Sequence, residues 1–520
     1  MARLRWLAAV CLSLHAQPQW LFFRSSLDGT EQPYAISVPA DLQASRRYPL
    51  VITLHAEDTD PRIHLRQVLG PPSRASVPDV LVACPLARGD MGYRGIAEQD
   101  VYDMLAAIER RFPVDPDRVT VTGASMGGGG ALWLALTRPD VWAAAAPISA
   151  AVVPGSDTLA PNLLALPVRF YHGEQDPLVP AAVARDWQRR LLDLGNPASY
   201  IEYPGIRHNA WDLAYRRGEL LDWLAAFRRN PYPDRVRLVT DSYRYAASYW
   251  VQIDGLTPGV LATIDARRSS PNAVTLETHD LDGFTLTLDR PAVSVTIDGA
   301  PLAVKAASTL SFVKTGGRWR QGRYQPMGKR PGAEGPIVEA VAGCPLYVYG
   351  SLGARSADEL DGRRKVAETA VRWTPAHARL DFAPRVKGDS EVTAQDIDTS
   401  DLVLFGNAQT NLLIARFAGS LPLALASGAA DYGLLFIAPE GKHYVLVSSG
   451  LPWWTGAEAA NRGGYTFAPA EYRLFSTFGD YILFKGGLGH VVAEGRFDRG
   501  WKVPADAAAR LAASGVITVQ

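Results

Sequence analysis

The chain has few cysteines, no net charge and no long apolar run after its N-terminus, and each absence excludes a class of protein. Three cysteines among 520 residues are too few for a disulfide framework. The 53 basic residues are balanced by 53 acidic residues, so nothing in the charge indicates a nucleic acid or an anionic membrane as partner. No later stretch of about 18 uncharged apolar residues occurs, so we expect no membrane span.

Histidine and cysteine pairs at the spacing of a metal site are also missing. We therefore predict no metal and no other cofactor. Cys84 and Cys344 each lie beside an apolar, strand-like run, where a buried free thiol is the ordinary expectation. A bridge between these two cysteines is the alternative.

Residues 1–16 have the layout of an export signal. Arg3 and Arg5 give a positive start, residues 6–14 form a short apolar run, and Ala16 lies where cleavage would follow. We therefore predict a secreted or periplasmic protein. An ordinary buried N-terminal helix is the alternative for this segment.

The length exceeds one ordinary core, and 47% apolar with 20% charged residues is typical of a folded protein. Short β-rich apolar runs alternate with helical stretches up to Pro233, which favours a mostly parallel sheet flanked by helices. Short alternating runs then predict a small β-sandwich, and a Gly- and Pro-rich connection precedes a second, smaller α/β region. The predicted division is a catalytic α/β domain at 17–233, a β-sandwich at 234–308, a linker at 309–334 and a C-terminal α/β domain at 335–520.

The segment Gly123-Ala-Ser125-Met-Gly127 has the sequence context of a nucleophile elbow. It follows the predicted strand at 118–122 directly and precedes the helical stretch at 128–137. In such an elbow the serine occupies a strained turn, and small residues on either side let the strand and the helix approach each other. Ser125 is therefore the candidate nucleophile.

Asp176 and His208 follow in the order that this arrangement requires. Asp176 lies in the loop after the predicted strand at 167–173, and His208 lies in the loop after the strand at 200–203. Asp176 would accept the Nδ1–H of His208, and His208 would take the proton of Ser125 as general base. His172 sits at the end of its strand and is expected to support the Asp176 loop by packing or by a hydrogen bond.

An oxyanion hole needs two backbone N–H groups directed at the developing negative charge. Met126, the residue after the serine, is the candidate for the first donor. Ala56 and Glu57, in the loop after the predicted strand at 48–55, are the candidates for the second.

Three separated segments together resemble the prolyl-oligopeptidase-like hydrolases of the α/β-hydrolase superfamily. They are residues 117–128 around Ser125, His172-Gly-Glu-Gln-Asp-Pro-Leu-Val-Pro180, and His208-Asn-Ala-Trp211. The likeness is greatest to the secreted esterases, which include polyhydroxybutyrate-depolymerase-like and feruloyl or acetyl esterases, and it covers residues 32–230. It implies acyl transfer to water through an acyl-serine. Where the family usually has His-Gly after the third strand, this chain has Ala56, so the second oxyanion donor stays open.

The function predicted from these residues is hydrolysis of carboxylic esters with short or aromatic acyl groups, either small molecules or esters carried on polysaccharide. One alternative is a serine peptidase, which would share every catalytic residue. Another is an inert scaffold or carbohydrate-binding protein, in which aromatic rows such as Trp453-Trp454 or Tyr243 to Trp250 would bind sugars. Aromatic residues at such spacing are more often part of a core.

Overall fold

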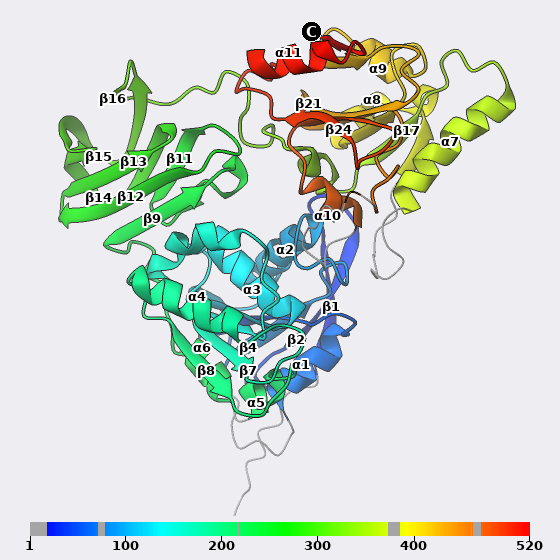
Figure 1. Ribbon diagram of the computed structural model, residues 1–520. Helices are drawn as coiled ribbons and strands as arrows, with labels where there is room; N and C mark the ends of the chain where they lie inside the picture. The colour runs from blue at the N-terminus through cyan, green and yellow to red at the C-terminus, as the bar shows by residue number, and fades with distance from the viewer. Residues whose placement is uncertain (1–17, 71–78, 217, 373–384, 459, 461–469) are drawn as a thin grey trace, which may run out of the picture.

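A computed structural model describes residues 18–70, 79–216, 218–372, 385–458, 460 and 470–520. The predicted signal segment, residues 1–16, lies outside these residues. Three large sheets follow one another along the chain, with eight, eight and seven strands, and a small sheet pairs β20 with β25 (Figure 1). No helix in the described ranges is both long and apolar enough to cross a bilayer.

The first sheet has the order β1-β2-β4-β3-β5-β6-β7-β8. From β4 to β8 the neighbouring strands are parallel, whereas β1 and β2 form an antiparallel edge. The strands β3, β4 and β6 are buried along their whole length, as expected for a sheet covered on both faces. The strands are β1 (Gln19–Arg24), β2 (Glu31–Ser37), β3 (Tyr48–Leu54), β4 (Leu81–Pro85), β5 (Val114–Ala124), β6 (Ala145–Ile148), β7 (Arg169–Gly173) and β8 (Ser199–Tyr203).

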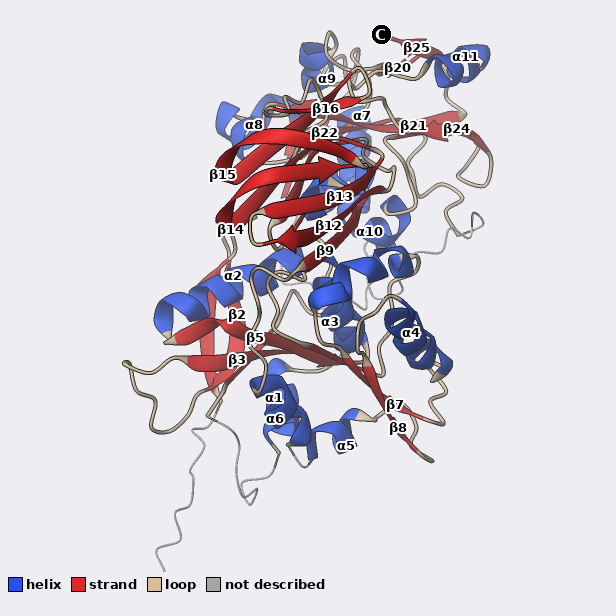
Figure 2. Cartoon of the chain, turned by 90° about the vertical axis from the view of Figure 1, so that its left-hand side faces the viewer, coloured by secondary structure: helices blue, strands red, loops and turns tan. Residues whose placement is uncertain are grey.

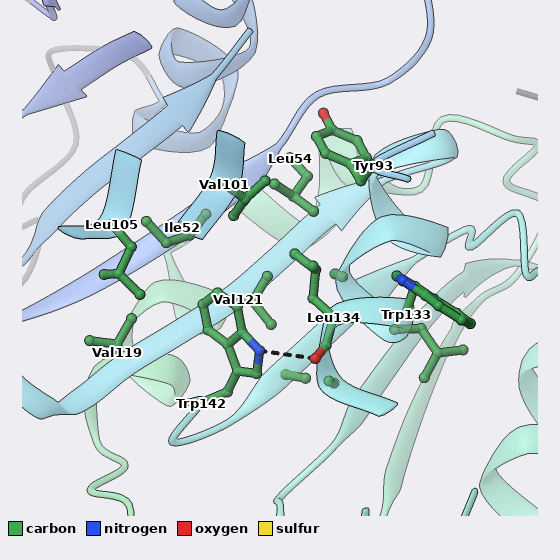
Figure 3. Close-up of a cluster of buried hydrophobic side chains, with 14 of the residues drawn as sticks. Ile52, Leu54, Tyr93, Val101, Leu105, Val119, Val121, Trp133, Leu134 and Trp142 are labelled. Carbon is green, nitrogen blue, oxygen red and sulfur yellow. Dashed lines mark hydrogen bonds between the residues drawn. The ribbon is translucent and has the colours of Figure 1, made fainter. Parts of the chain in front are cut away.

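Helices cover both faces of this sheet, as the alternation of strands and helices predicted (Figure 2). One face carries α2 (Ile96–Arg111), α3 (Met126–Thr137) and α4 (Ala182–Asp193); the other carries α1 (Pro61–Leu69), α5 (Trp211–Arg216) and α6 (Glu219–Ala225). Figure 3 shows the core between β3, β5 and helices α2 and α3, where the Trp142 indole N–H donates to the Leu134 carbonyl at 3.2 Å. This packing fixes the C-terminal ends of the strands, where the candidate site lies.

The second sheet has the order β10-β11-β14-β13-β12-β9, and β15 pairs with β14 and β16. Residues from nearly all of these strands share one core, and the edge strands β9 and β10 contact each other, so the sheet curls around that core. Its elements are β9 (Arg235–Thr240), η2 (Tyr243–Tyr245), β10 (Ala247–Ser248), β11 (Val251–Leu256), β12 (Ala262–Ser270), β13 (Ala273–His279), β14 (Leu281–Ile297), β15 (Ala300–Thr315) and β16 (Arg318–Gln321).

Two details of this sheet differ from the sequence prediction. One continuous sheet replaces the two stacked sheets of a sandwich, because the 17-residue β14 pairs with β11 at its start and with β13 at its end. Strands also continue beyond residue 308, since β15 and β16 extend the sheet to Gln321 inside the predicted linker. The alternating pattern of residues 309–321 fits this pairing. Separate folding at the predicted domain boundaries stays a prediction.

The third sheet has the order β18-β17-β19-β22-β21-β23-β24, parallel from β18 to β22 and antiparallel beyond. The elements are η3 (Ile337–Val341), β17 (Leu346–Tyr349), α7 (Ala357–Arg372), β18 (Arg385–Gly388), η4 (Asp389–Glu391), α8 (Ala394–Thr399), β19 (Leu402–Phe405), α9 (Leu412–Phe417), β20 (Leu423–Leu425), β21 (Tyr432–Glu440), β22 (His443–Gly450), α10 (Ala470–Phe475), β23 (Tyr481–Lys485), β24 (Val491–Gly495), α11 (Ala505–Ala513) and β25 (Ile517–Val519).

The segment at 151–166 joins the first sheet to the second. It forms the 3-10 helix η1 (Ser156–Ala165), and η1 packs on β9, α3 and α4. The buried Asn162 accepts a hydrogen bond from Val239 N at 2.7 Å and donates to Val239 O at 3.0 Å and to Leu136 O at 2.9 Å. Because β9 is an edge strand with unpaired backbone groups, this amide acts as its missing partner.

The aromatic rows mostly lie inside the fold. Trp250 and Trp453 are each 1% exposed, and Tyr243 is 6% exposed, so these side chains contribute to cores and present no face to a sugar. Cys84 and Cys344 are both free thiols; Cys84 is fully buried in β4 and Cys344 is partly exposed.

Candidate active site

Ser125 stands at the sharp turn between β5 and α3. Its φ of 54° and ψ of −113° lie in a region that residues with a side chain rarely adopt. The turn is held by the backbone: Ser125 N donates to Ile148 O at 2.9 Å, and Ser125 O accepts from Gly129 N and Ala151 N. The serine is therefore fixed at the C-terminal end of the sheet and at the start of a helix.

The glycines on either side of Ser125 are required by contact distance. A side chain on Gly123 would collide with the Gly127 carbonyl, and one on Gly127 would collide with the carbonyls of Leu54 and His55. The loop after β3 thus lies directly against the first turn of α3. This confirms the prediction that small residues here let the strand and the helix approach each other.

The loops that carry Asp176 and His208 are joined by backbone hydrogen bonds. Glu174 N donates to Tyr203 O at 3.1 Å, and Gln175 N donates to Ile206 O at 2.9 Å. Gly173, at the end of β7, permits this approach, because a Cβ there would collide with the carbonyls of Ile206 and Arg207. Gly173 was not predicted from the sequence as a site residue, although its place at the end of a strand and before an acidic loop was a usable signal.

These loops bring the three predicted side chains into one hydrogen-bonded row, called here the candidate triad. His208 Nε2 lies 2.8 Å from Ser125 Oγ, and His208 Nδ1 lies 2.7 Å from Asp176 Oδ2. The imidazole packs edge-on against Trp211 with ring centroids 5.3 Å apart, and its side chain is 16% exposed. Asp176 is fully enclosed, so the row runs from the interior to the surface.

The Asp176 carboxylate is held as an anion by its donors. Burial alone would raise its pKa, but the hydrogen bond from His208 and the backbone N–H groups of Val179 and Leu178 outweigh burial and lower the pKa below its ordinary value. A charged carboxylate at this position orients the His208 ring and stabilises its protonated form.

The candidate oxyanion donors lie on both sides of the serine. Met126 is the first residue of α3, and the N–H groups of a helix's first turn have no partner within the helix. Ala56 and Glu57 follow β3 in the loop that contacts Gly127; Ala56 is partly exposed and Glu57 is exposed. Tyr93 donates its hydroxyl to His55 O at 3.0 Å and so ties this loop to the segment before α2.

Three other histidines in this part of the chain have structural partners. His64 Nε2 lies 2.8 Å from Thr53 Oγ1, and burial lowers the pKa of His64 to about 3. His55 lies within hydrogen-bond distance of the carbonyls of Ala56 and Leu86. His172 contacts the Val179 carbonyl at 2.9 Å, which confirms that it supports the Asp176 loop. Within the described ranges, no group of three or more His, Cys, Asp or Glu side chains is arranged to hold a metal ion.

The part of the chain that holds the candidate triad is similar to known esterases. The family model Esterase, described as "Putative esterase", matches residues 101–228, which include all of the candidate triad. Over these residues the chain has an esterase-like α/β-hydrolase fold. No curated protein sequence matches the chain.

Several solved structures are similar to part of the chain. A thermostable esterase is 24% identical with a TM-score of 0.36, over 41% of this chain and 63% of that one. The fluorophosphonate-binding serine hydrolase F of Staphylococcus aureus is 21% identical with a TM-score of 0.35, over 41% of this chain and 98% of that one. A ferulic acid esterase of Anaeromyces mucronatus is 12% identical with a TM-score of 0.33, over 41% of this chain and 91% of that one.

Proposed function

We propose that the chain is a serine hydrolase of carboxylic esters, with Ser125 as nucleophile, His208 as general base and Asp176 as the residue that orients His208. The observation that carries the proposal is the continuous row from Ser125 Oγ through both nitrogens of His208 to Asp176, with heavy-atom distances of 2.8 Å and 2.7 Å. Both distances are within the range that proton transfer requires. The match of residues 101–228 to an esterase family model supports the same reaction.

In this mechanism Ser125 Oγ attacks the ester carbonyl carbon while its proton passes to His208 Nε2. The negative charge on the carbonyl oxygen is stabilised by the Met126 N–H and by an N–H of the loop at 56–57. The alcohol then leaves with the proton from His208, and an acyl-serine remains. Water repeats the attack, gives its proton to His208, and releases the carboxylic acid and Ser125.

Short or aromatic acyl esters are the proposed substrates, including those carried on polysaccharide. The segment at 151–166, where many hydrolases carry a cap, is short, and its helix η1 packs on β9, α3 and α4. We therefore expect the site around Ser125 to be open. Long acyl chains gain about 0.8 kcal/mol for each CH₂ group that is buried, and an open site offers little apolar surface for this gain. Export to the periplasm or the medium belongs to the same proposal.

The test is covalent labelling with a fluorophosphonate together with kcat/KM on a panel of esters. Wild type should be labelled and should hydrolyse acetyl, butyryl and feruloyl esters, whereas Ser125→Ala should lose labelling and nearly all turnover. Ser248→Ala is the matched control, since Ser248 is a buried serine in the second sheet. Equal labelling of Ser125→Ala and wild type would contradict the assignment of the nucleophile.

Acyl and peptide specificity are tested on the same protein. We expect kcat/KM to be higher for acetyl than for palmitoyl esters, and higher for esters than for proline-containing peptide amides. A preference for the peptides would favour the serine peptidase instead, and a preference for palmitoyl would contradict the open site.

A further inference from the structure

His172 lies beside the candidate triad and its ring nitrogens have different surroundings. It is in β7, four residues before Asp176, and is 1% exposed. Its Nε2 lies 2.9 Å from Val179 O and 3.1 Å from Asp176 Oδ2. Both neighbours can only accept, so Nε2 carries the hydrogen; its hydrogen bond goes to Val179 O, and Asp176 Oδ2 lies beside it in close electrostatic contact.

The Asp176 carboxylate accepts three hydrogen bonds and has a fourth N–H group, that of His172, in close contact. Its Oδ1 accepts from Leu178 N at 2.9 Å and from Val179 N at 3.0 Å. Its Oδ2 accepts from His208 Nδ1 at 2.7 Å and has His172 Nε2 at 3.1 Å. His172 thus shares with His208 the one oxygen atom that would act in catalysis.

We propose that His172 is a positioning residue that directs Asp176 Oδ2 toward His208 and limits the charge that this oxygen presents. The inference rests on the proposed function, because it assigns a role within the same site. With two backbone donors on one oxygen and His172 on the other, the carboxylate cannot rotate away when His208 changes its protonation state. Second donors of this kind orient a reactive group without touching the substrate.

The second ring nitrogen of His172, Nδ1, is consistent with the same role. His172 Nδ1 and Ser149 Oγ are both buried, and neither has a hydrogen-bond partner among the described residues. They occupy neighbouring places, since Ser149 N donates to Tyr171 O at the end of the β6–β7 pair. Among the described residues Nδ1 has no acceptor to which it could donate, whereas Nε2 has the Val179 carbonyl, so the hydrogen is favoured on Nε2.

Removal of the His172 N–H should change both kcat and the pH profile, each in a defined direction. The carboxylate becomes less well oriented, so kcat falls while KM changes little, because His172 does not reach the substrate. Asp176 Oδ2 also carries more negative charge, which stabilises protonated His208. The acidic limb of the kcat/KM profile should therefore move to higher pH.

The test compares His172→Leu with His172→Gln, in which the Gln Nε2 can replace the donor. We expect His172→Leu to lower kcat by about 10- to 100-fold, as is usual for lost supporting hydrogen bonds, and to move the acidic limb upward. His172→Gln should restore most of the rate and the wild-type limb. A residue that only stabilises the fold would lower the unfolding temperature and the fraction labelled by fluorophosphonate, but would leave kcat per labelled site and the pH profile unchanged.

Nitrogen-15 NMR of the wild-type histidines tests the idea without a destabilised variant. The His172 signal, assigned as the one missing from His172→Gln, should show the Nε2–H tautomer. An Nδ1–H tautomer would overturn the proposal, as would wild-type kcat and pH profile in His172→Leu. Failure of the proposed function itself is distinguishable, because Ser125→Ala would then keep its labelling whatever His172 does.

Discussion

Asn162 is predicted to couple the first sheet to the second, and Asn162→Ala tests this. The side chain is 3% exposed and makes three hydrogen bonds to backbone atoms, two of them to the edge strand β9. Alanine would leave Val239 N–H and the carbonyls of Val239 and Leu136 without this partner.

The size of the effect follows from those three groups. A buried backbone group left unpaired costs about 1–3 kcal/mol, and a carbonyl that water can reach costs the least. The Val239 N–H and carbonyl face η1 inside the contact, so we expect Asn162→Ala to lower the free energy of unfolding by roughly 3–6 kcal/mol.

Asn196→Ala is the matched control. Asn196 is 1% exposed, and its amide donates to Leu163 O at 2.5 Å and to Leu166 O at 2.7 Å. It therefore holds the end of η1 from the loop between α4 and β8, and these bonds do not reach β9. Both variants should loosen η1, but only Asn162→Ala should loosen β9.

Denaturant unfolding and hydrogen exchange measured by mass spectrometry check these expectations. In Asn162→Ala, exchange should become faster in peptides covering 156–165 and 235–240. In Asn196→Ala, exchange should become faster at 156–166 while 235–240 keeps the wild-type rate. Wild-type protection of β9 in Asn162→Ala, with stability lowered by less than about 1 kcal/mol, would refute the coupling.

Three further predictions address the His208 loop and two buried charges. Gly173→Ala should lower kcat/KM of ester hydrolysis at least about tenfold, because its Cβ would push the Arg207 carbonyl and the His208 loop away from Asp176; unchanged kcat/KM would contradict this. Burial raises the pKa of Glu471 from 4.5 to about 8, so the stability that depends on its protonation is complete below pH 4.5 and lost as the pH rises to 8. Glu471→Gln should thus gain stability over wild type between pH 5 and 8, by at most roughly 5 kcal/mol in denaturant unfolding, and an equal pH dependence of both proteins would refute it. Lys329→Met should cost about 3–5 kcal/mol by thermal unfolding, because it leaves the buried Asp480 without its cation; the double change with Asp480→Leu should recover most of the loss.

The sequence by itself was sufficient to identify the candidate triad. Ser125, Asp176 and His208 each follow a strand whose apolar run is visible in the sequence, and parallel strands bring their C-terminal ends to one edge of a sheet. Gly123 and Gly127 were recognisable for the same reason, since a tight strand-to-helix turn has local requirements. These signals are short in range and depend little on the rest of the fold.

The tertiary structure alone decided the contacts between segments that are far apart in the sequence. The second sheet runs to Gln321 because β14 and β15 are long enough to pair with partners at both of their ends; a local alternating pattern fits a strand but does not reveal which strands it pairs with. Asn162 meets Val239 only because η1 packs against an edge strand 77 residues later. His172 shares Asp176 Oδ2 with His208 only after two loops have joined through Gly173. Local sequence sets the type of each element, whereas these pairings depend on packing that buries both partners together.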